Sequence, residues 1–394
     1  MGEHGLAGNS EHGRRNEYVY RHDGGCQHRH PGSVGGGDGL HNLGVLLGGI
    51  CPFLSGSETG QIILSSSSIN VPSDFAGMQV LKAALPTGFT SQIARNWDQS
   101  NASSGSAAIV RYIGTSLGVF DWSRFDLFMS NNAGKKILFT LGQPADWMIT
   151  RSAIGGANAG GKANMCPTGA TELTTNYLPV VQAIVTRARD TWGVTGIIWE
   201  LWNEIEGPGM LATAELGALA PMAKVIGPAI KAIDATAVVL TPSARDDDTA
   251  FLVGNFLAAS DGATGKGGDY VDGIAFHFYG LNSPWTYKYN CDVYRQKAID
   301  AGYPGLPLYI TESGMLSSTA NSGAILQRRM AVFAACGVKC FIAYATDSGE
   351  NPLGAYAAEW NAAVSALAGK TITQCTKNLD GTVTVVANGA AVTF

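Results

Sequence analysis

From Ile69 onward, short hydrophobic runs alternate with longer segments of helical pattern. The runs that predict buried strands are 75–80, 92–97, 136–142, 196–202, 237–243, 273–280, 308–314 and 340–347. Between several of them, apolar residues recur at helical spacing, most clearly over 178–193, 219–234 and 324–337. Strands that are almost continuously apolar are typical of a parallel sheet covered on both faces, and eight strands close a (β/α)8 TIM barrel.

An open, doubly wound sheet is the alternative fold. It is disfavoured because no G-x-G-x-x-G turn follows the first strand. After the predicted barrel, residues 61–370, the last stretch changes its period. Thr and Val alternate over 371–394 around the turn signals LDG and NG, which predicts a short antiparallel β segment. We expect this segment to pack on the barrel, with 61–67 as a candidate partner.

The first 60 residues differ from the rest of the chain. They hold 16 of the 51 glycines and show neither helical nor strand periodicity, which predicts a disordered tail. Within and just beyond the apolar run 43–54, the segment 43–57 resembles the core and cleavage site of a secretory signal, although the region before it is longer than in such signals. The expected location is therefore secreted or periplasmic.

Composition limits the possible partners. Apolar residues make up 45% of the chain and charged residues 14%, which is enough for a large core. The net charge of −5 and the absence of a basic run argue against nucleic acid as a partner. No continuous apolar run reaches about 18 residues, so no membrane span is expected. The sequence does not indicate an oligomeric state.

Histidine and cysteine placement limits the chemistry. Six of the seven histidines lie in the first 41 residues, and His277 is the seventh. A zinc site with several histidine ligands therefore does not fit the barrel, and a Ser-His-Asp triad would have to use His277. We expect carboxylate chemistry without a metal or organic cofactor. The seven cysteines form no C-x-x-C pair, which leaves disulfides and buried thiols both open.

Polar and aromatic residues follow the predicted strands where a barrel places its functional groups, at the carboxyl ends. The candidates, in strand order, are Arg95, Trp97, Asp98, Trp147, Asn203, Glu204, His277, Tyr279, Glu312 and Tyr344. If the strands are those predicted, these side chains converge on one mouth. Trp202, which also ends the fourth predicted strand, would belong to the same mouth, and exposed tryptophans there would suit stacking against sugar rings.

Glu204 and Glu312 end the fourth and seventh predicted strands and would face each other across the barrel. Two facing carboxyl groups are the equipment for hydrolysis of a glycosidic bond, one as proton donor and the other as nucleophile. Arg95 and Tyr279 could keep the attacking carboxylate ionised by charge and hydrogen bonding. Glu204 and Glu312 are therefore the predicted catalytic pair.

These motifs resemble a known group of enzymes. WELWNE followed by YITESG is similar to clan A glycoside hydrolases, and the upstream segment ARNWDQ…GVFDWSRFDLFMSNNAGKKILFTLGQPADW is most similar to family 39, which contains β-xylosidases, α-iduronidases and exopolysaccharide hydrolases. The likeness extends from about Phe75 to Gly369. It implies that Glu204 is the acid/base, that Asn203 contacts the sugar 2-hydroxyl and that Glu312 is the nucleophile. His277 and Tyr279 would then line the site.

The chain departs from the family pattern at two places. Ile205 and Glu206 follow the Asn-Glu pair where family members commonly have Pro-Asn, and Tyr344 stands where a tryptophan often lies under the sugar. Both departures affect the expected sugar subsites and leave the catalytic groups in place.

Other residues near these motifs have structural interpretations. We expect Glu200 to lie inside the barrel paired with an arginine, Glu206 to lie at the rim and Trp199 to point outward under a helix. The run RDDD, 245–248, is typical of a solvated loop, with a grip on a charged sugar as the minor alternative.

The leading hypothesis is a retaining glycoside hydrolase acting on β-linked oligo- or polysaccharide, with carboxyl groups about 5–5.5 Å apart. Two alternatives stay open, a barrel that binds carbohydrate without catalysis and a transglycosylase that uses the same residues. The sequence does not identify the sugar, and the short C-terminal segment only mildly favours endo over exo action.

Overall fold

The computed structural model describes residues 60–62, 64, 67–80, 88–96, 109–154, 161–206, 210–279, 283–314, 322–344 and 356–394. All of them belong to one compact unit, Phe53–Phe394. The predicted tail 1–60, apart from Gly60, and the signal-like segment 43–57 lie outside the described residues. So do two candidate site residues, Trp97 and Asp98.

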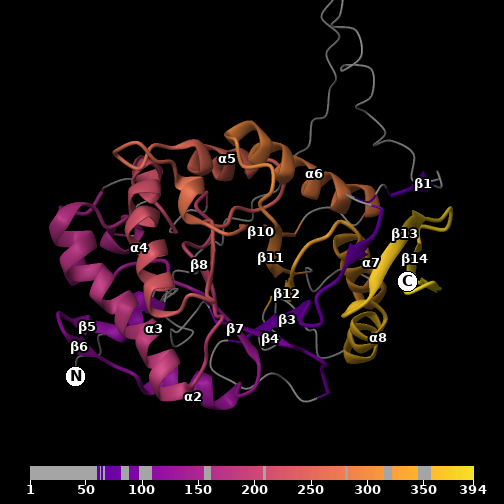
Figure 1. Ribbon diagram of the computed structural model, residues 1–394, viewed down its shortest axis with the longest axis horizontal. Helices are drawn as coiled ribbons and strands as arrows, with labels where there is room; N and C mark the ends of the chain where they lie inside the picture. The colour runs from indigo at the N-terminus through magenta and orange to yellow at the C-terminus, as the bar shows by residue number, and fades with distance from the viewer. Residues whose placement is uncertain are drawn as a thin grey trace, which may run out of the picture. The chain divides into compact units, whose positions relative to one another are not determined.

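Eight parallel strands form the central sheet (Figure 1). They are β3 (Ala76–Gln79), β4 (Ile93–Asn96), β7 (Lys136–Thr140), β8 (Ile198–Glu200), β9 (Val238–Leu240), β10 (Ile274–Phe278), β11 (Leu308–Ser313) and β12 (Phe341–Ala343). Their order is β10-β11-β12-β3-β4-β7-β8-β9, and isolated parallel bridges between Leu240 and Gly273 and between Arg245 and His277 join β9 to β10. The predicted (β/α)8 barrel is confirmed, and each predicted run contains one strand.

Helices surround the sheet. The α-helices are α1 (Ile109–Ile113), α2 (Ser123–Asn131), α3 (Leu178–Trp192), α4 (Leu219–Ile233), α5 (Ala250–Ala258), α6 (Pro284–Ala301), α7 (Ser322–Ala335) and α8 (Ala357–Leu367). The 3-10 helices are η1 (Asp146–Met148), η2 (Gly161–Asn164), η4 (Thr213–Ala218) and η5 (Gly267–Tyr270), and η3 (Gly169–Tyr177) is a π-helix that leads into α3. The predicted helices are α3, α4 and α7. Helix α3 has a proline in its first turn and ends at Gly193, whose φ of 65° favours glycine.

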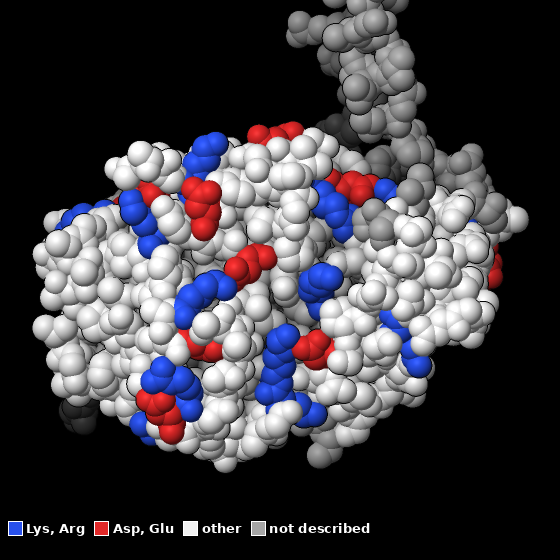
Figure 2. Space-filling view, viewed as in Figure 1, with Lys and Arg blue, Asp and Glu red and all other residues white. Residues whose placement is uncertain are grey.

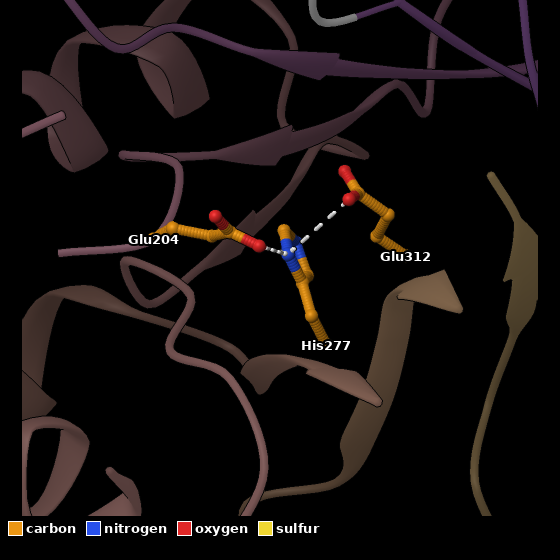
Figure 3. Close-up of side chains that lie close together, drawn as sticks. All are labelled: Glu204, His277 and Glu312. Atoms are coloured by element: carbon orange, nitrogen blue, oxygen red, sulfur yellow. Dashed lines mark hydrogen bonds and ion pairs between the residues drawn. The ribbon is translucent and has the colours of Figure 1, made fainter. Parts of the chain in front are cut away.

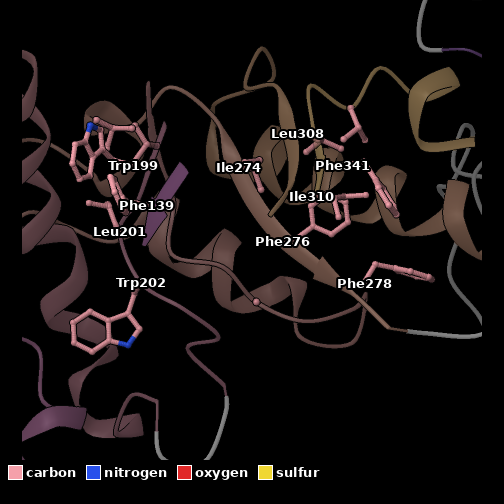
Figure 4. Packing of buried hydrophobic residues seen from close by; sticks show 14 of the residues in the cluster. Phe139, Trp199, Leu201, Trp202, Ile274, Phe276, Phe278, Leu308, Ile310 and Phe341 are labelled. Atoms are coloured by element: carbon pink, nitrogen blue, oxygen red, sulfur yellow. The ribbon is translucent and has the colours of Figure 1, made fainter. Parts of the chain in front are cut away.

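Alternation along the strands separates an inner from an outer core. The inner cluster fills the barrel and contains Ile93, Leu138, Ile198, Leu240, Ala275, Cys340 and Ile342. Their strand neighbours point outward and pack against the helices, as Figure 4 shows for Phe139, Trp199 and Phe276. Trp199 is fully buried and stacks on Phe139 with ring centroids 5.5 Å apart, so its predicted packing role is confirmed.

A second sheet lies beside α7 and α8 at the end of the chain (Figure 1). Strands β13 (Thr371–Lys377), β14 (Val383–Ala387) and β15 (Ala390–Thr393) form an antiparallel meander, and β1 (Gly60–Gln61) and β2 (Ile69–Asn70) pair with β13. Arg328 of α7 donates a hydrogen bond to the carbonyl of Gly381, 2.9 Å away. The C-terminal β addition thus packs on a barrel helix. A two-stranded ribbon, β5 (Gly114–Ser116) with β6 (Val119–Phe120), lies elsewhere in the chain.

Within the described ranges, one segment is long and apolar enough to cross a membrane by composition alone, Thr213–Ile233. It comprises η4 and α4, and α4 is a barrel helix with a buried face that includes Met222 and Ile226. Its apolar residues are not continuous, because Glu215, Lys224 and Lys231 interrupt them. On the face drawn in Figure 2, charged side chains lie mainly in small groups of opposite sign separated by uncharged surface.

Candidate active site

A layer of polar side chains lies directly above the inner apolar cluster. Each inner position is followed two residues later by another inward position, because side chains alternate along a strand. In this way Gly77 leads to Gln79, Ile93 to Arg95, Leu138 to Thr140, Ile198 to Glu200 and Ala275 to His277. All five residues at the upper positions are completely buried. The strands therefore change from aliphatic to polar toward their carboxyl ends.

Arg95 connects this layer. Its Nη1 donates to Gln79 and, over 2.6 Å, to Glu312 Oε2. Its Nη2 donates to Glu200 Oε2 at 2.8 Å and to Asn203 Oδ1 at 2.9 Å. Burial by itself lowers the pKa of a guanidinium, but the charges of Glu200 and Glu312 outweigh it and raise the pKa of Arg95. Arg95 is therefore a permanent cation between two carboxylates.

Glu200 is the fully buried partner of Arg95. It also accepts hydrogen bonds from the hydroxyl groups of Thr140 and Thr311. Burial opposes ionisation, but the charge of Arg95 and the hydrogen bonds hold the pKa of Glu200 well below its usual range. The predicted position inside the barrel, paired with an arginine, is confirmed.

Glu312, from the end of β11, is bound at both carboxylate oxygens. Oε2 accepts from Arg95, and Oε1 accepts from the hydroxyl of Tyr279. Only 5% of Glu312 is exposed. Burial and the nearby negative charge of Glu312 raise the pKa of Tyr279, so the phenol keeps its proton and remains a donor. The structure thus brings Arg95, Tyr279 and Glu312 together as predicted.

Glu204 follows β8 with a left-handed backbone, at a φ of 45°, which is uncommon for a residue with a Cβ. The conformation is held by hydrogen bonds to the next strand: its N–H donates to Ser243 Oγ over 3.1 Å, and the N–H of Ile205 donates to the Ser243 carbonyl over 3.1 Å. Figure 3 shows the result, with the carboxyl groups of Glu204 and Glu312 on either side of the His277 ring. The unusual backbone thus places Glu204 in the mouth of the barrel.

His277 is buried among three carboxylates. Its Nδ1 lies 2.9 Å from Glu204 Oε1 and 3.8 Å from Glu312 Oε1, and its Nε2 lies 3.5 Å from Glu200 Oε1. Burial lowers the pKa of an imidazole, but the negative charge of Glu312 and the contacts with Glu200 and Glu204 raise the pKa of His277 to about 10. Burial raises the pKa of Glu204, but the hydrogen bond and the charge of His277 outweigh it and lower the pKa of Glu204.

A metal-like spacing occurs in the same place. One ligand atom from each of Glu204, His277 and Glu312 lies within 4.8 Å of the other two, and this is the one such group found in the described part of the chain. A cation here would compete with the proton on His277 and with the donors Arg95 and Tyr279, which already bind Glu312. These donors already balance the carboxylates.

The remaining candidates lie at different distances from the carboxylates. Asn203 is buried and accepts from Arg95, as given above. The ring of Tyr344 packs edge to face against Tyr279, with centroids 6.3 Å apart. Trp147 is partly buried on η1, and its indole N–H donates to the carbonyl of Gly114 over 2.9 Å, so the indole is oriented by the ribbon β5–β6. Within the described residues, Trp147 forms no hydrogen bond with Glu204 or Glu312.

Three expectations need correction. Trp202 was expected among the exposed tryptophans of the mouth, but it is fully buried in the outer core and its N–H donates to the Met210 carbonyl. Glu206 was expected at the rim, but its side chain is only 9% exposed and pairs with Arg245. The run 245–248 was expected to be a solvated loop. Arg245 keeps 43% of its side chain exposed, but the same side chain also pairs with Glu206 and Glu204.

The sequence interpretation also missed Gln79, Thr140 and Thr311. A threonine in a hydrophobic run is easily attributed to strand preference alone. The available signal was the alternation: Gln79 lies two residues beyond the inward position Gly77, and Thr140 two residues beyond Leu138 of the inner cluster, so both face the barrel axis.

Comparisons with known proteins support the fold. No protein-family model and no curated protein matches the sequence. Among solved structures, the chain is similar to a glucosidase from Croceicoccus marinus (13% identity, 80% of this chain and 72% of that chain, TM-score 0.57) and a monomeric β-xylosidase from Caulobacter crescentus CB15 (18%, 81% and 74%, 0.54). A family 39 glycoside hydrolase from Bacteroides cellulosilyticus WH2 matches at 14% identity over 82% and 69%, with a TM-score of 0.53. The chain therefore shares its fold with these glycoside hydrolases, one of which is a family 39 enzyme.

Proposed function

We propose that the protein is a retaining glycoside hydrolase that cleaves β-linked glycosidic bonds in an oligo- or polysaccharide. The observation that carries the proposal is the approach of Glu204 and Glu312, whose carboxylate oxygens come within 4.8 Å of each other at the mouth of the barrel. Such a short separation favours a covalent intermediate, because inverting enzymes need about 6.5–9.5 Å between the carboxyl groups to admit a water.

Glu312 is the proposed nucleophile. Its carboxylate attacks the anomeric carbon and forms a glycosyl ester, while the leaving oxygen takes a proton from Glu204. In the second step, Glu204 removes a proton from a water that attacks the same carbon, and Glu312 is released. Arg95 and Tyr279 orient the Glu312 carboxylate by donating to its two oxygens.

The proton for the first step lies on the Glu204–His277 pair. His277 holds a proton at neutral pH, and its Nδ1 is 2.9 Å from Glu204 Oε1. Transfer across this hydrogen bond gives a neutral imidazole and a protonated Glu204, which is the form that can donate to the leaving oxygen. We therefore assign His277 the role of holding the proton beside the acid/base.

The test is turnover of aryl β-glycosides and β-linked polysaccharides, with β-xylosides and β-glucosides included because two matched structures are a β-xylosidase and a glucosidase. Proton NMR of the first product should show the β-anomer before mutarotation. Glu312→Gln should lose almost all activity. Glu204→Gln should lose about 10²–10⁴-fold on substrates with poor leaving groups and less on activated ones.

Asp190→Asn, in an exposed ion pair on α3, is the matched control and should keep full activity. An inverted product would contradict the mechanism. Saccharide binding without turnover would support the binding barrel instead, and sugar-to-sugar transfer products would indicate a transglycosylase.

A further inference from the structure

Arg245 and Glu206 form an ion pair beside the proposed acid/base. Arg245 Nε lies 3.2 Å from Glu206 Oε1 and 3.8 Å from Glu204 Oε1, so one N–H group faces two carboxylates. The backbone N–H of Arg245 also donates to Glu206 Oε1, over 2.8 Å. Glu206 thus holds both the main chain and the side chain of Arg245.

We propose that Arg245 and Glu206 are positioning residues for the acid/base: Glu206 holds the Arg245 guanidinium where it stabilises Glu204 each time that carboxyl group loses its proton. This inference rests on the proposed function. The pair occupies a place where the chain departs from the family pattern, since Glu206 stands where family members commonly have Asn. It is therefore a feature of this chain.

The backbone around Arg245 is fixed. Arg245 forms an isolated bridge with His277, in which the His277 N–H donates to the Ala244 carbonyl over 2.9 Å and the Asp246 N–H donates to the His277 carbonyl over 3.1 Å. His277, which holds the proton, and Arg245, which carries the counter-charge, are thus neighbours across one bridge. Both reach Glu204 Oε1, from adjacent strands.

The charge of Glu206 depends on the charge of Glu204. One of its oxygens, Oε2, is buried without a hydrogen-bond partner in the described residues. Burial, and next the negative charge of Glu204, raise the pKa of Glu206. An ionised Glu204 therefore competes with Glu206 for Arg245, and a protonated Glu204 leaves Arg245 to Glu206. The pair responds to the two protonation states that a retaining mechanism needs from its acid/base.

The charged and titratable groups around Glu204 determine the sign of each effect. They are His277 on β10, Arg245 after β9, Glu206 on the loop after β8 that also carries Glu204, Glu200 on β8, Arg95 on β4, Glu312 on β11 and Tyr279 after β10. Removing the positive charge of Arg245 destabilises the ionised form of Glu204. Removing the negative charge of Glu206 stabilises that form. The two substitutions should therefore act in opposite directions.

The test uses Arg245→Gln and Glu206→Gln, with Arg245→Lys as the variant that keeps the charge. On a substrate with a poor leaving group, the basic limb of kcat/KM should move up by about one pH unit in Arg245→Gln and down by less in Glu206→Gln. Arg245→Lys should restore most of the wild-type profile. Unshifted limbs, or shifts of both glutamine variants in the same direction, overturn the proposal.

A second measurement needs no turnover. In protein labelled with ¹³C at glutamate side-chain carboxyls, the resonance that disappears in Glu204→Gln reports the titration of Glu204. It should show the same opposite shifts in the two glutamine variants. If the wild type cleaves no substrate, the proposed function fails while this titration still decides the role of Arg245 and Glu206. Thermal midpoints of the variants identify any that are misfolded.

Discussion

Replacing Glu200 with glutamine removes one charge from the buried cluster while keeping the shape of the side chain. In the wild type, Arg95 lies between Glu200 and Glu312 with both ion pairs at or below 2.8 Å, and neither Arg95 nor Glu200 is exposed. The substitution leaves Arg95 with half of its compensation. Glutamine can still bond to Thr311, so geometry is largely retained and the loss is mainly electrostatic.

The size of the effect follows from burial. Breaking a buried pair by removing one partner costs about 3–5 kcal/mol. With the hydroxyl bonds retained, we expect the lower end, about 3 kcal/mol. In a domain of this size, each kcal/mol lowers the thermal midpoint by about 2 °C, so the expected shift is about 6 °C.

The assay is thermal unfolding at neutral pH, followed by tryptophan fluorescence and circular dichroism. Asp190→Asn removes a carboxylate from an exposed pair and should leave the midpoint unchanged. If Glu200→Gln unfolds within about 1 °C of the wild type, the pairing of Glu200 with Arg95 does not stabilise the barrel and the reasoning is refuted.

Three further predictions follow from other features. The pKa of His277 is raised from 6.5 to about 10, so the contribution of its positive charge to stability is complete below pH 6.5 and is lost as the pH rises through 10. The difference in thermal midpoint between the wild type and His277→Gln should therefore shrink over that range. A constant difference would contradict the assignment of the charge to His277. Gly77→Ala should destabilise the fold by about 1–3 kcal/mol, because the added Cβ would lie 2.4 Å from Ile342 Cδ1 and 2.7 Å from Ile93 Cβ. Gly217→Ala, whose Cβ would have nothing within 4 Å, is the control and should not destabilise it. Equal thermal midpoints for the two variants would count against the packing argument. The five described cysteines are buried free thiols and should react with a thiol reagent only after unfolding, which a native-state count would check.

The strands and main helices could be predicted from the sequence because each carries its own local pattern. The position of Glu200 could be predicted too. It follows Ile198 on the same side of a strand, so alternation alone placed it inside the barrel, where a carboxylate requires a cation. The pairing of Glu204 with Glu312 required one further step, the rule that parallel strands of a barrel end at one mouth.

Arg245 and Glu206 could not be placed in this way. The run RDDD has the composition of a solvated loop, and a glutamate just after the motif WELWNE is expected at the rim of the barrel. The burial of Glu206 and its pairing with the half-exposed Arg245 depend on a bridge between Arg245 and His277, which are distant in sequence and form no continuous strand pair. Contacts of this kind depend on how β9 and β10 meet where the barrel closes, and the local periodicity of the sequence carries no information about that.

The join between β9 and β10 has a consequence for motion. Their described residues are connected by isolated bridges, whereas pairs such as β3 with β4 and β7 with β8 share continuous ladders. Local unfolding should therefore require less free energy at this join, and its amide protons should exchange with deuterium sooner than those of β4 and β7. Because Arg245 and His277 form one of the two bridges, each opening event would also separate Glu204, the proposed acid/base, from His277, while Glu204 stays bonded to Ser243 beside Arg245. Exchange at this join would then measure how often the site is assembled.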